Sequence, residues 1–107
     1  MKNFKDTLEK FPDVSHIKEI KLINNNNNKD KFEFILNIQG SQGSIKLYNH
    51  LFIVFGELNV NASIEGLNLY CEHVEDAKNN PGKHPNIDRL LDITKTKETL
   101  KIEIVKK

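Results

Sequence analysis

The stretch that decides the fold is Phe32-Glu33-Phe34-Ile35-Leu36-Asn37-Ile38-Gln39. Its even-numbered positions are all apolar, and its polar side chains fall only at odd-numbered positions. An apolar residue at every second position is typical of a β-strand, in which successive side chains point to opposite faces. We therefore expect a strand over residues 32–38.

A second strand is expected just before this stretch, over the run Ile17 to Ile23. Between the two runs lie the asparagine tract from Asn24 to Asn28 and the pair Lys29-Asp30. An asparagine-rich tract can favour aggregation, but between two strands it is more simply interpreted as a polar loop. The two strands are therefore predicted to form a hairpin.

The segment before the hairpin has helical spacing. Phe4, Leu8 and Phe11 lie at positions i, i+4 and i+7, which share one face of a helix. Asn3 can cap this helix at its start, and Pro12 ends it. A short N-terminal helix is therefore expected.

The segment after the hairpin is ambiguous. Gly40-Ser41-Gln42-Gly43 is predicted to be a turn, and Ile45 to Leu47 a short strand. Tyr48 to Phe55 is apolar on nearly every face, so that it suits either a strand or a buried helix. Because Gly56 is a typical helix stop, we expect a short buried helix here.

The longest helix is expected over Asn61–Asn79, followed by the helix-ending run Asn79-Asn80-Pro81-Gly82. The apolar arc of this helix is formed by Ile64, Leu67, Tyr70, Cys71 and Val74. Another helix is predicted from Pro85 to about Ile93, since proline is tolerated at the first helical position. The inner face of that helix is formed by Ile87, Leu90, Leu91 and Thr94.

A polar turn over Thr94–Thr99 leads to a last strand, in which Leu100, Ile102 and Ile104 alternate with charged residues. The expected fold is α+β: a small antiparallel sheet of three or four strands, made by the hairpin and the C-terminal strand, packed against three or four helices. With 107 residues, the chain is expected to form a single domain over residues 1–107.

Charge and composition narrow the classes of partner. The formal net charge is +1, and lysines alternate with acids along the whole length, which argues against a nucleic acid or an anionic membrane as partner. The longest apolar run, Leu51 to Phe55, is far shorter than the roughly 20 residues of a membrane span. We expect no signal peptide in the first residues, and the single cysteine, Cys71, cannot form an intramolecular disulfide. A cytoplasmic location is expected.

Several stretches carry a resemblance to a known family. They are Tyr48-Asn49, Phe55-Gly56, Gly66–Tyr70, Glu72-His73, Asp76-Ala77 and, most specifically, Pro81–Leu90. In these stretches the chain resembles a group of small bacterial proteins, the domain of unknown function 2322 family. The resemblance implies a bacterial origin and a one-domain layout, and it implies no activity.

The densest polar chemistry lies between the last two predicted helices. Gly82 lets the backbone approach a ligand closely, and Pro85 begins a helix whose free N–H groups attract anions. Lys83 and His84 stand at that end of the helix and can add positive charge. A phosphate or a carboxylate is therefore the predicted guest.

Two other interpretations of the same segment remain open. Asn86 and Asp88 are ordinary residues for the start of a helix, so that the segment could be only a well-capped turn. Alternatively, His73 and Asp76 at i and i+3, with His84 and Asp88 at i and i+4, could meet across two antiparallel helices. Zinc accepts such nitrogen and oxygen ligands, although no metal-binding signature is present.

The remaining polar residues carry weaker expectations. Cys71 lies in the apolar arc, and a buried, inert thiol is expected there. Tyr48 and His50 could line a small pocket or simply end a buried element. Arg89 is expected to point away from the core, either into solvent or towards an acid such as Asp92.

The sequence as a whole favours a binding or interaction domain without enzymatic activity. Its predicted ligand-binding residues are Lys83, His84, Asn86, Arg89, His73, Asp76, Tyr48 and Asn49. The expected partner is a small anion or an acidic group on a protein, with no cofactor, and a homodimer is left open. The alternative is a small metal- or histidine-dependent enzyme that uses His73, Asp76, His84 and Asp88.

Overall fold

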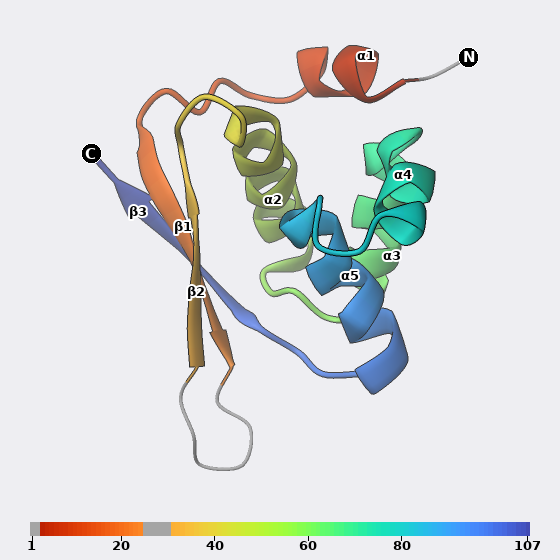
Figure 1. The fold of residues 1–107 in the computed structure, drawn as a ribbon. Coiled ribbons are helices and arrows are strands. Elements are labelled where there is room, and N and C mark those ends of the chain that lie inside the picture. Colours follow the sequence, from red (N-terminus) through yellow and green to blue (C-terminus); the bar gives the residue numbers. More distant parts are fainter. Residues whose placement is uncertain (1–2, 25–30) are drawn as a thin grey trace.

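The computed structural model describes residues 3–24 and 31–107, so that the predicted asparagine loop lies mostly outside the described residues. Five helices and three strands are present in the described part of the chain (Figure 1). In chain order they are α1 (Phe4–Glu9), β1 (Ile17–Asn24), β2 (Lys31–Leu36), α2 (Gln42–Phe55), α3 (Val60–Tyr70), α4 (His73–Asn79), α5 (Pro85–Thr96) and β3 (Lys101–Lys106).

The three strands form one antiparallel sheet in the order β2-β1-β3. Ile20 in the central strand is paired with Ile35 on one side and with Ile104 on the other. Figure 1 shows the helices gathered on one face of the sheet. The predicted α+β fold, with a hairpin and a C-terminal strand as the sheet, is therefore confirmed.

Strand β2 turns the less apolar of its two rows towards the helices. Ile35 is buried at 2% exposure, whereas Phe32 and Phe34 remain about half exposed, at 50% and 52%. The register explains this orientation, because it aligns Ile35 and Glu33 with the buried Ile20 and Leu22 of β1. The predicted alternation is confirmed, but its apolar row lies on the outer side of the sheet.

Helix α2 begins earlier than predicted. The short strand expected over Ile45–Leu47 is wrong, because these residues belong to a 14-residue helix that begins at Gln42. Ile45, Tyr48 and Leu51, spaced three residues apart, are all fully buried. The helix ends where predicted, at Gly56, whose φ of 78° is left-handed and suits a residue without a β-carbon.

The long helix predicted over Asn61–Asn79 is broken into two. Cys71 has a φ of 55° and a ψ of −121°, which stops α3 and redirects the chain into α4. Of the predicted arc, Tyr70 is buried and Leu67 packs against the core, but Ile64 is exposed. Gly66 faces the core instead, where an added β-carbon would lie 2.8 Å from Cδ1 of Leu90.

Helix α5 completes the core and extends one turn beyond its predicted end. Ile87, Leu90 and Ile93 are buried in a cluster that also holds the inner faces of α2, β1 and β3. Within the described part of the chain, no helix is both long and apolar enough to cross a bilayer.

Candidate functional site

The turn between α4 and α5 presents one carboxylate to two basic side chains. The Oδ2 atom of Asp76 lies 2.6 Å from Nε2 of His84 and 3.2 Å from Nζ of Lys83. The hydrogen bond from His84, followed by that from Lys83, lowers the pKa of the Asp76 carboxyl. The carboxylate can therefore only accept hydrogen bonds at neutral pH, so that Nε2 of His84 carries the proton in this bond.

Further hydrogen bonds within the turn hold Asp76 in place and fix the course of the backbone. Asn80 donates from Nδ2 to both the carbonyl oxygen and Oδ1 of Asp76, at 3.1 and 3.0 Å. Gly82 adopts a left-handed φ of 91°, and its N–H donates to Oδ2 of Asp88 at 2.9 Å. The Lys83 side chain is 62% exposed, so that this corner opens onto water.

A hollow of about 340 Å³ opens beside the turn, between the starts of α2 and α5. We call it the α2–α5 hollow. Its polar and charged lining residues are Ser41, Ser44, Tyr70, His73, Lys83, His84 and Asn86. No carboxylate belongs to the described residues that line it.

The first turn of α2 contributes backbone groups to this hollow. Gly40, Gly43 and Ser44 line it, and Ser41 is the residue that precedes the helix. The Ser41 side chain does not cap the helix, because its hydroxyl donates to the carbonyl oxygens of Leu36 and Ile38 instead. The N–H groups at this helix end, which carry a partial positive charge, therefore receive no hydrogen bond from a capping side chain.

Two hydroxyl groups and a ring stack close the inner side of the hollow. Ser44 Oγ and Tyr70 Oη lie 2.7 Å apart. Burial raises the pKa of the Tyr70 hydroxyl well above its ordinary value, so that it stays a neutral hydrogen-bonding group. Phe4 stacks on Tyr70 with ring centroids 5.0 Å apart and meets His73 edge-on at 5.1 Å.

One family model matches residues 4–104, nearly the whole chain, and is described as an uncharacterized protein conserved in bacteria (DUF2322). The chain belongs to the DUF2322 family. The resemblance seen around Pro81–Leu90 is thereby confirmed. No curated protein and no solved structure gives a significant match to the chain.

In this DUF2322 protein, four of the predicted binding residues share the α2–α5 hollow. Lys83, His84, Asn86 and His73 all line it. Asp76 does not line the hollow but contacts Lys83 and His84. Tyr48, Arg89 and Asn49 lie elsewhere. Asn49 is buried on α2, while Tyr48 and Arg89 belong to a hydrogen-bond network that shares Asn86 with the hollow.

The prediction that Arg89 points away from the core is wrong. Arg89 is only 9% exposed and donates from Nε and Nη2 to the carboxylate of Glu33, at 3.2 and 3.4 Å. Its Nη1 atom donates to Tyr48 Oη and to Asn86 Oδ1, at 3.1 and 3.0 Å. The orientation of β2 explains the difference. Its Glu33 side chain points towards the helices and so reaches the face of α5 that carries Arg89.

The four residues of the predicted metal site meet only in part. His84 contacts Asp76, and the rings of His73 and His84 lie with centroids 5.9 Å apart. Asp88 turns back to the N–H of Gly82 instead. Among the described residues, no group of three or more His, Cys, Asp or Glu side chains is placed to hold a metal ion.

Sequence reasoning did not place Ser41, Ser44 or Tyr70 in the site. Tyr70 was assigned to an apolar helix arc, and the two serines lie in or beside a predicted turn. The only feature of these three residues that could have indicated a binding role is a side-chain hydroxyl, and each lies in or beside a segment whose pattern predicts a turn or a helix. Ser44 and Tyr70 are 26 residues apart in the chain, so that only the packing of α2 against α3 brings them together.

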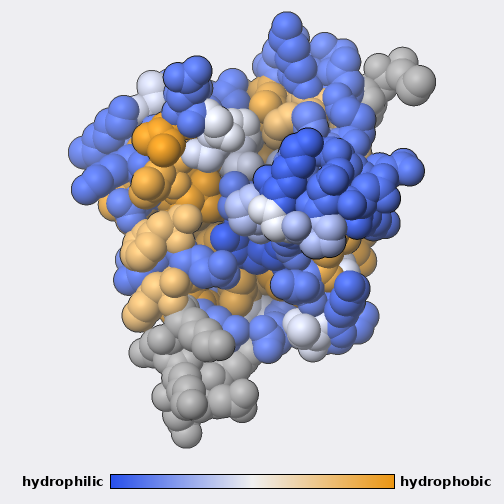
Figure 2. All heavy atoms as spheres, in the orientation of Figure 1, coloured by the Kyte–Doolittle hydropathy of each residue, from blue (hydrophilic) through white to orange (hydrophobic). Residues whose placement is uncertain are grey.

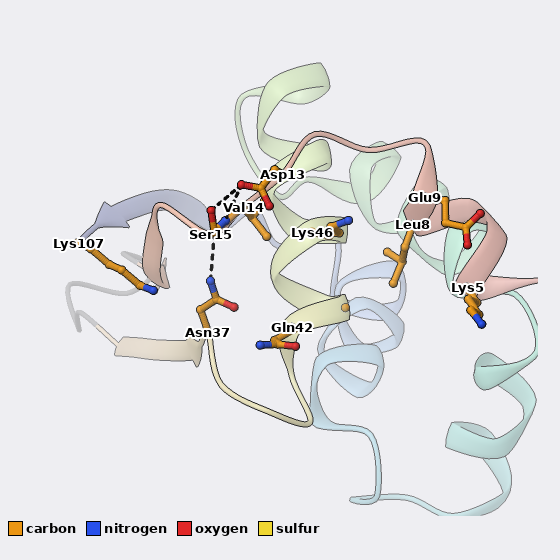
Figure 3. Close-up of a pocket in the computed structure, with 11 residues that line it drawn as sticks. Lys5, Leu8, Glu9, Asp13, Val14, Ser15, Asn37, Gln42, Lys46 and Lys107 are labelled. Atoms are coloured by element: carbon orange, nitrogen blue, oxygen red, sulfur yellow. Dashed lines mark hydrogen bonds between the residues drawn. The ribbon is translucent and has the colours of Figure 1, made fainter.

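A second hollow, of about 540 Å³, lies on another side of the first turn of α2 (Figure 3). Its charged lining residues are Lys5, Lys46, Lys107, Glu9 and Asp13. Figure 3 shows these side chains coming from α1, from the linker before β1, from α2 and from the C-terminal end. A hydrogen bond from Ser15 lowers the pKa of Asp13 and keeps that carboxylate ionised. This hollow therefore mixes both signs of charge.

Proposed function

We propose that this protein is a binding domain, and that its α2–α5 hollow takes a small oxyanion, phosphate or carboxylate. One observation carries the proposal: the hollow is lined by a lysine, two histidines and several neutral polar groups, and no described lining residue is a carboxylate. The 540 Å³ hollow contains Glu9 and Asp13, which would repel an anion. A third and larger hollow, beside α5, is lined by Glu33, Asp88, Asp92 and Glu98.

The start of α2 supplies the second part of the argument. The N–H groups at a helix start carry a partial positive charge, worth about 0.3–1 kcal/mol to an exposed anion. Helix α2 has 14 residues, and its first turn borders the hollow without a side-chain cap. An oxyanion there would accept from backbone N–H groups and would compete with Asp76 for the charge of Lys83. Hydrogen bonds to charged groups are stronger than those between neutral groups.

The size of the hollow favours a small guest. Sites for small molecules usually measure about 300–1,000 Å³, and this hollow, at about 340 Å³, lies at the lower end of that range. It is also open to water, since Lys83 at its rim is well exposed. The same chemistry suits a free anion or a single acidic group at the end of a larger partner.

Thermal shift in the presence of inorganic phosphate tests the proposal, with acetate as a second arm and chloride at equal ionic strength as reference. We expect phosphate to raise the melting temperature of the wild type and Lys83→Ala to weaken the apparent affinity about tenfold. Lys46→Ala is the matched control, because Lys46 is on α2 but lines the other hollow.

A variant of opposite sign makes this test sharper. Asp76→Asn removes the carboxylate that holds Lys83 and His84, so that both become available to the anion. We expect this variant to bind phosphate more tightly than the wild type. Equal phosphate shifts in the wild type, Lys83→Ala and Asp76→Asn would reject the site, and a loss confined to Lys46→Ala would move it to the other hollow.

A histidine-dependent enzyme is the second candidate, and the Asp76–His84 hydrogen bond of 2.6 Å favours it. A carboxylate that orients a histidine is the usual arrangement of a general base. Hydrolysis of simple phosphate and carboxylate esters separates the two candidates. An enzyme would lose activity in both Asp76→Asn and His84→Gln, whereas the binding domain shows no turnover and gains affinity in Asp76→Asn. Metal analysis of the native protein and of His73→Ala completes the comparison.

A further inference from the structure

The side of the sheet that faces away from the helices carries an apolar row. We call this side the outer sheet face; by the strand register it presents Phe32, Phe34 and Leu36 of β2, Glu19, Lys21 and Ile23 of β1, and Lys101, Glu103 and Val105 of β3. The three β2 residues are each about half exposed, and Ile38 beyond them is 57% exposed. Figure 2 shows hydrophobic side chains gathered over β2.

On β2 this pattern is the reverse of an ordinary solvated sheet face, although β1 and β3 also present charged residues there. An antiparallel sheet with one wet face normally turns its polar residues outwards. A fully covered aromatic side chain buries about 150–250 Å², so that each half-exposed ring leaves on the order of 100 Å² in water. Together with Leu36 and Ile38, the row reaches the size of patches that mark interaction sites, about 300–600 Å².

We propose that a second copy of this chain covers the outer sheet face, so that two three-stranded sheets stack as a β-sandwich. The charges on this face support a second copy over a different partner. Glu19 and Lys21 follow one another on the same side of β1, beside Leu36 and Phe34 respectively. A two-fold axis across the strands between these two positions sets Glu19 of each copy opposite Lys21 of the other, and Leu36 opposite Phe34. Along β1 and β2 the face is therefore complementary to itself, whereas on β3 the same axis sets Glu103 opposite Val105.

The area of the face sets the strength of the dimer. Three strands of about six residues, spaced about 4.8 Å apart and rising about 3.4 Å per residue, span a face of roughly 14 by 20 Å. Such a face buries less than the roughly 800 Å² per partner of a standard interface. The dimer is therefore expected to be weak and to dissociate on dilution between millimolar and micromolar concentrations.

Sedimentation velocity over a concentration series from micromolar to millimolar tests the proposal. We expect the wild type to pass from monomer to dimer and Phe34→Glu to stay monomeric, because a charge in the middle of the apolar row of β2 would be buried against apolar side chains. Ile53→Glu is the control, since Ile53 on α2 is 62% exposed but lies outside the outer sheet face. It should dimerise as the wild type does.

A charge exchange on β1 tests the two-fold register itself. Glu19→Lys and Lys21→Glu should each weaken the dimer about tenfold, and the double variant should restore it. Pairing through the free edge of β2 would not oppose these residues, and such a dimer would ignore the exchange. Circular dichroism verifies that each variant is folded. If Phe34→Glu does not fold, the sedimentation of the β1 variants tests the proposal without it. The proposal is overturned if the wild type stays monomeric at every concentration, which is the result expected if a different protein covers this face. It is also overturned if the double variant dimerises as weakly as the single variants.

Discussion

Arg89 ties α5 to the sheet through four hydrogen bonds from one guanidinium group. Two of them reach Glu33 on β2, and the others reach Tyr48 on α2 and Asn86 within α5. Tyr48 Oη in turn donates to the carbonyl oxygen of Asn86 at 2.6 Å. A single buried side chain therefore connects three elements.

The two ends of the Arg89–Glu33 pair are expected to differ in their effect on stability. Arg89→Ala removes a buried partner of three groups and should lower the free energy of unfolding by about 2–4 kcal/mol. Glu33→Ala leaves two donors of the buried guanidinium without their partner, but water can reach them because the Glu33 side chain is 58% exposed; the loss should be smaller, about 1–2 kcal/mol. Urea unfolding of both variants measures the difference. Equal losses would contradict this account of the network.

At the level of single residues, the sequence predicted what depends on local spacing. Lys83 and His84 follow a glycine turn and precede a helix-starting proline, so that their position at a helix entrance could be inferred. The Arg89–Glu33 pair joins residues 56 positions apart, and nothing in the spacing around Arg89 indicates it. Long-range pairs of this kind depend on the register of β1 and β2.

The break between α3 and α4 is the element that shapes the site most. It places His73 at the start of α4, where the imidazole reaches both Phe4 and His84. The Glu72 carboxylate accepts from the N–H of Phe4 at 2.9 Å and so holds α1 against the break. A continuous helix, as the apolar spacing predicted, would have turned His73 along the axis of α3. Apolar periodicity alone could not reveal the break, because no proline or glycine marks it.

The backbone at the break is strained for a residue with a β-carbon. A left-handed φ costs such a residue about 1–2 kcal/mol, whereas glycine adopts it freely. We expect Cys71→Gly to be more stable than Cys71→Ala by about 1 kcal/mol, since both remove the thiol but only glycine relieves the strain. Thermal or urea unfolding of the two variants provides the comparison. A more stable alanine variant would show that the left-handed turn is not present in solution.

Strand β2 shows that an apolar residue at every second position predicts a strand but does not predict which face of the strand is buried. Either row of its residues could face the core, and the apolar row is the more obvious candidate. The pairing with β1 decides otherwise, because it aligns Ile35 with Ile20 and lets Glu33 reach Arg89. The position of the strand was therefore predictable, and the face that it buries was not.

For the whole molecule, the prediction of one domain over residues 1–107 leads to a test of cooperativity. The buried cluster includes residues from β1, β2, β3, α2, α3, α4 and α5. We expect a single unfolding transition, seen alike by circular dichroism of the helices and by fluorescence of the two tyrosines, both of which are buried. Two transitions at different urea concentrations would indicate separate folding units.

The central place of β1 in the sheet has a consequence for folding kinetics. Its pairing with β2 is a hairpin, which can close within microseconds, whereas its pairing with β3 joins Ile17 to Lys106 across almost the whole chain. Contacts between distant positions slow folding, because the intervening chain loses conformational entropy before these contacts contribute any stabilising free energy. We therefore expect β3 to dock late, and until then one edge of β1 is open to pairing with other chains. Refolding yield should fall as protein concentration rises.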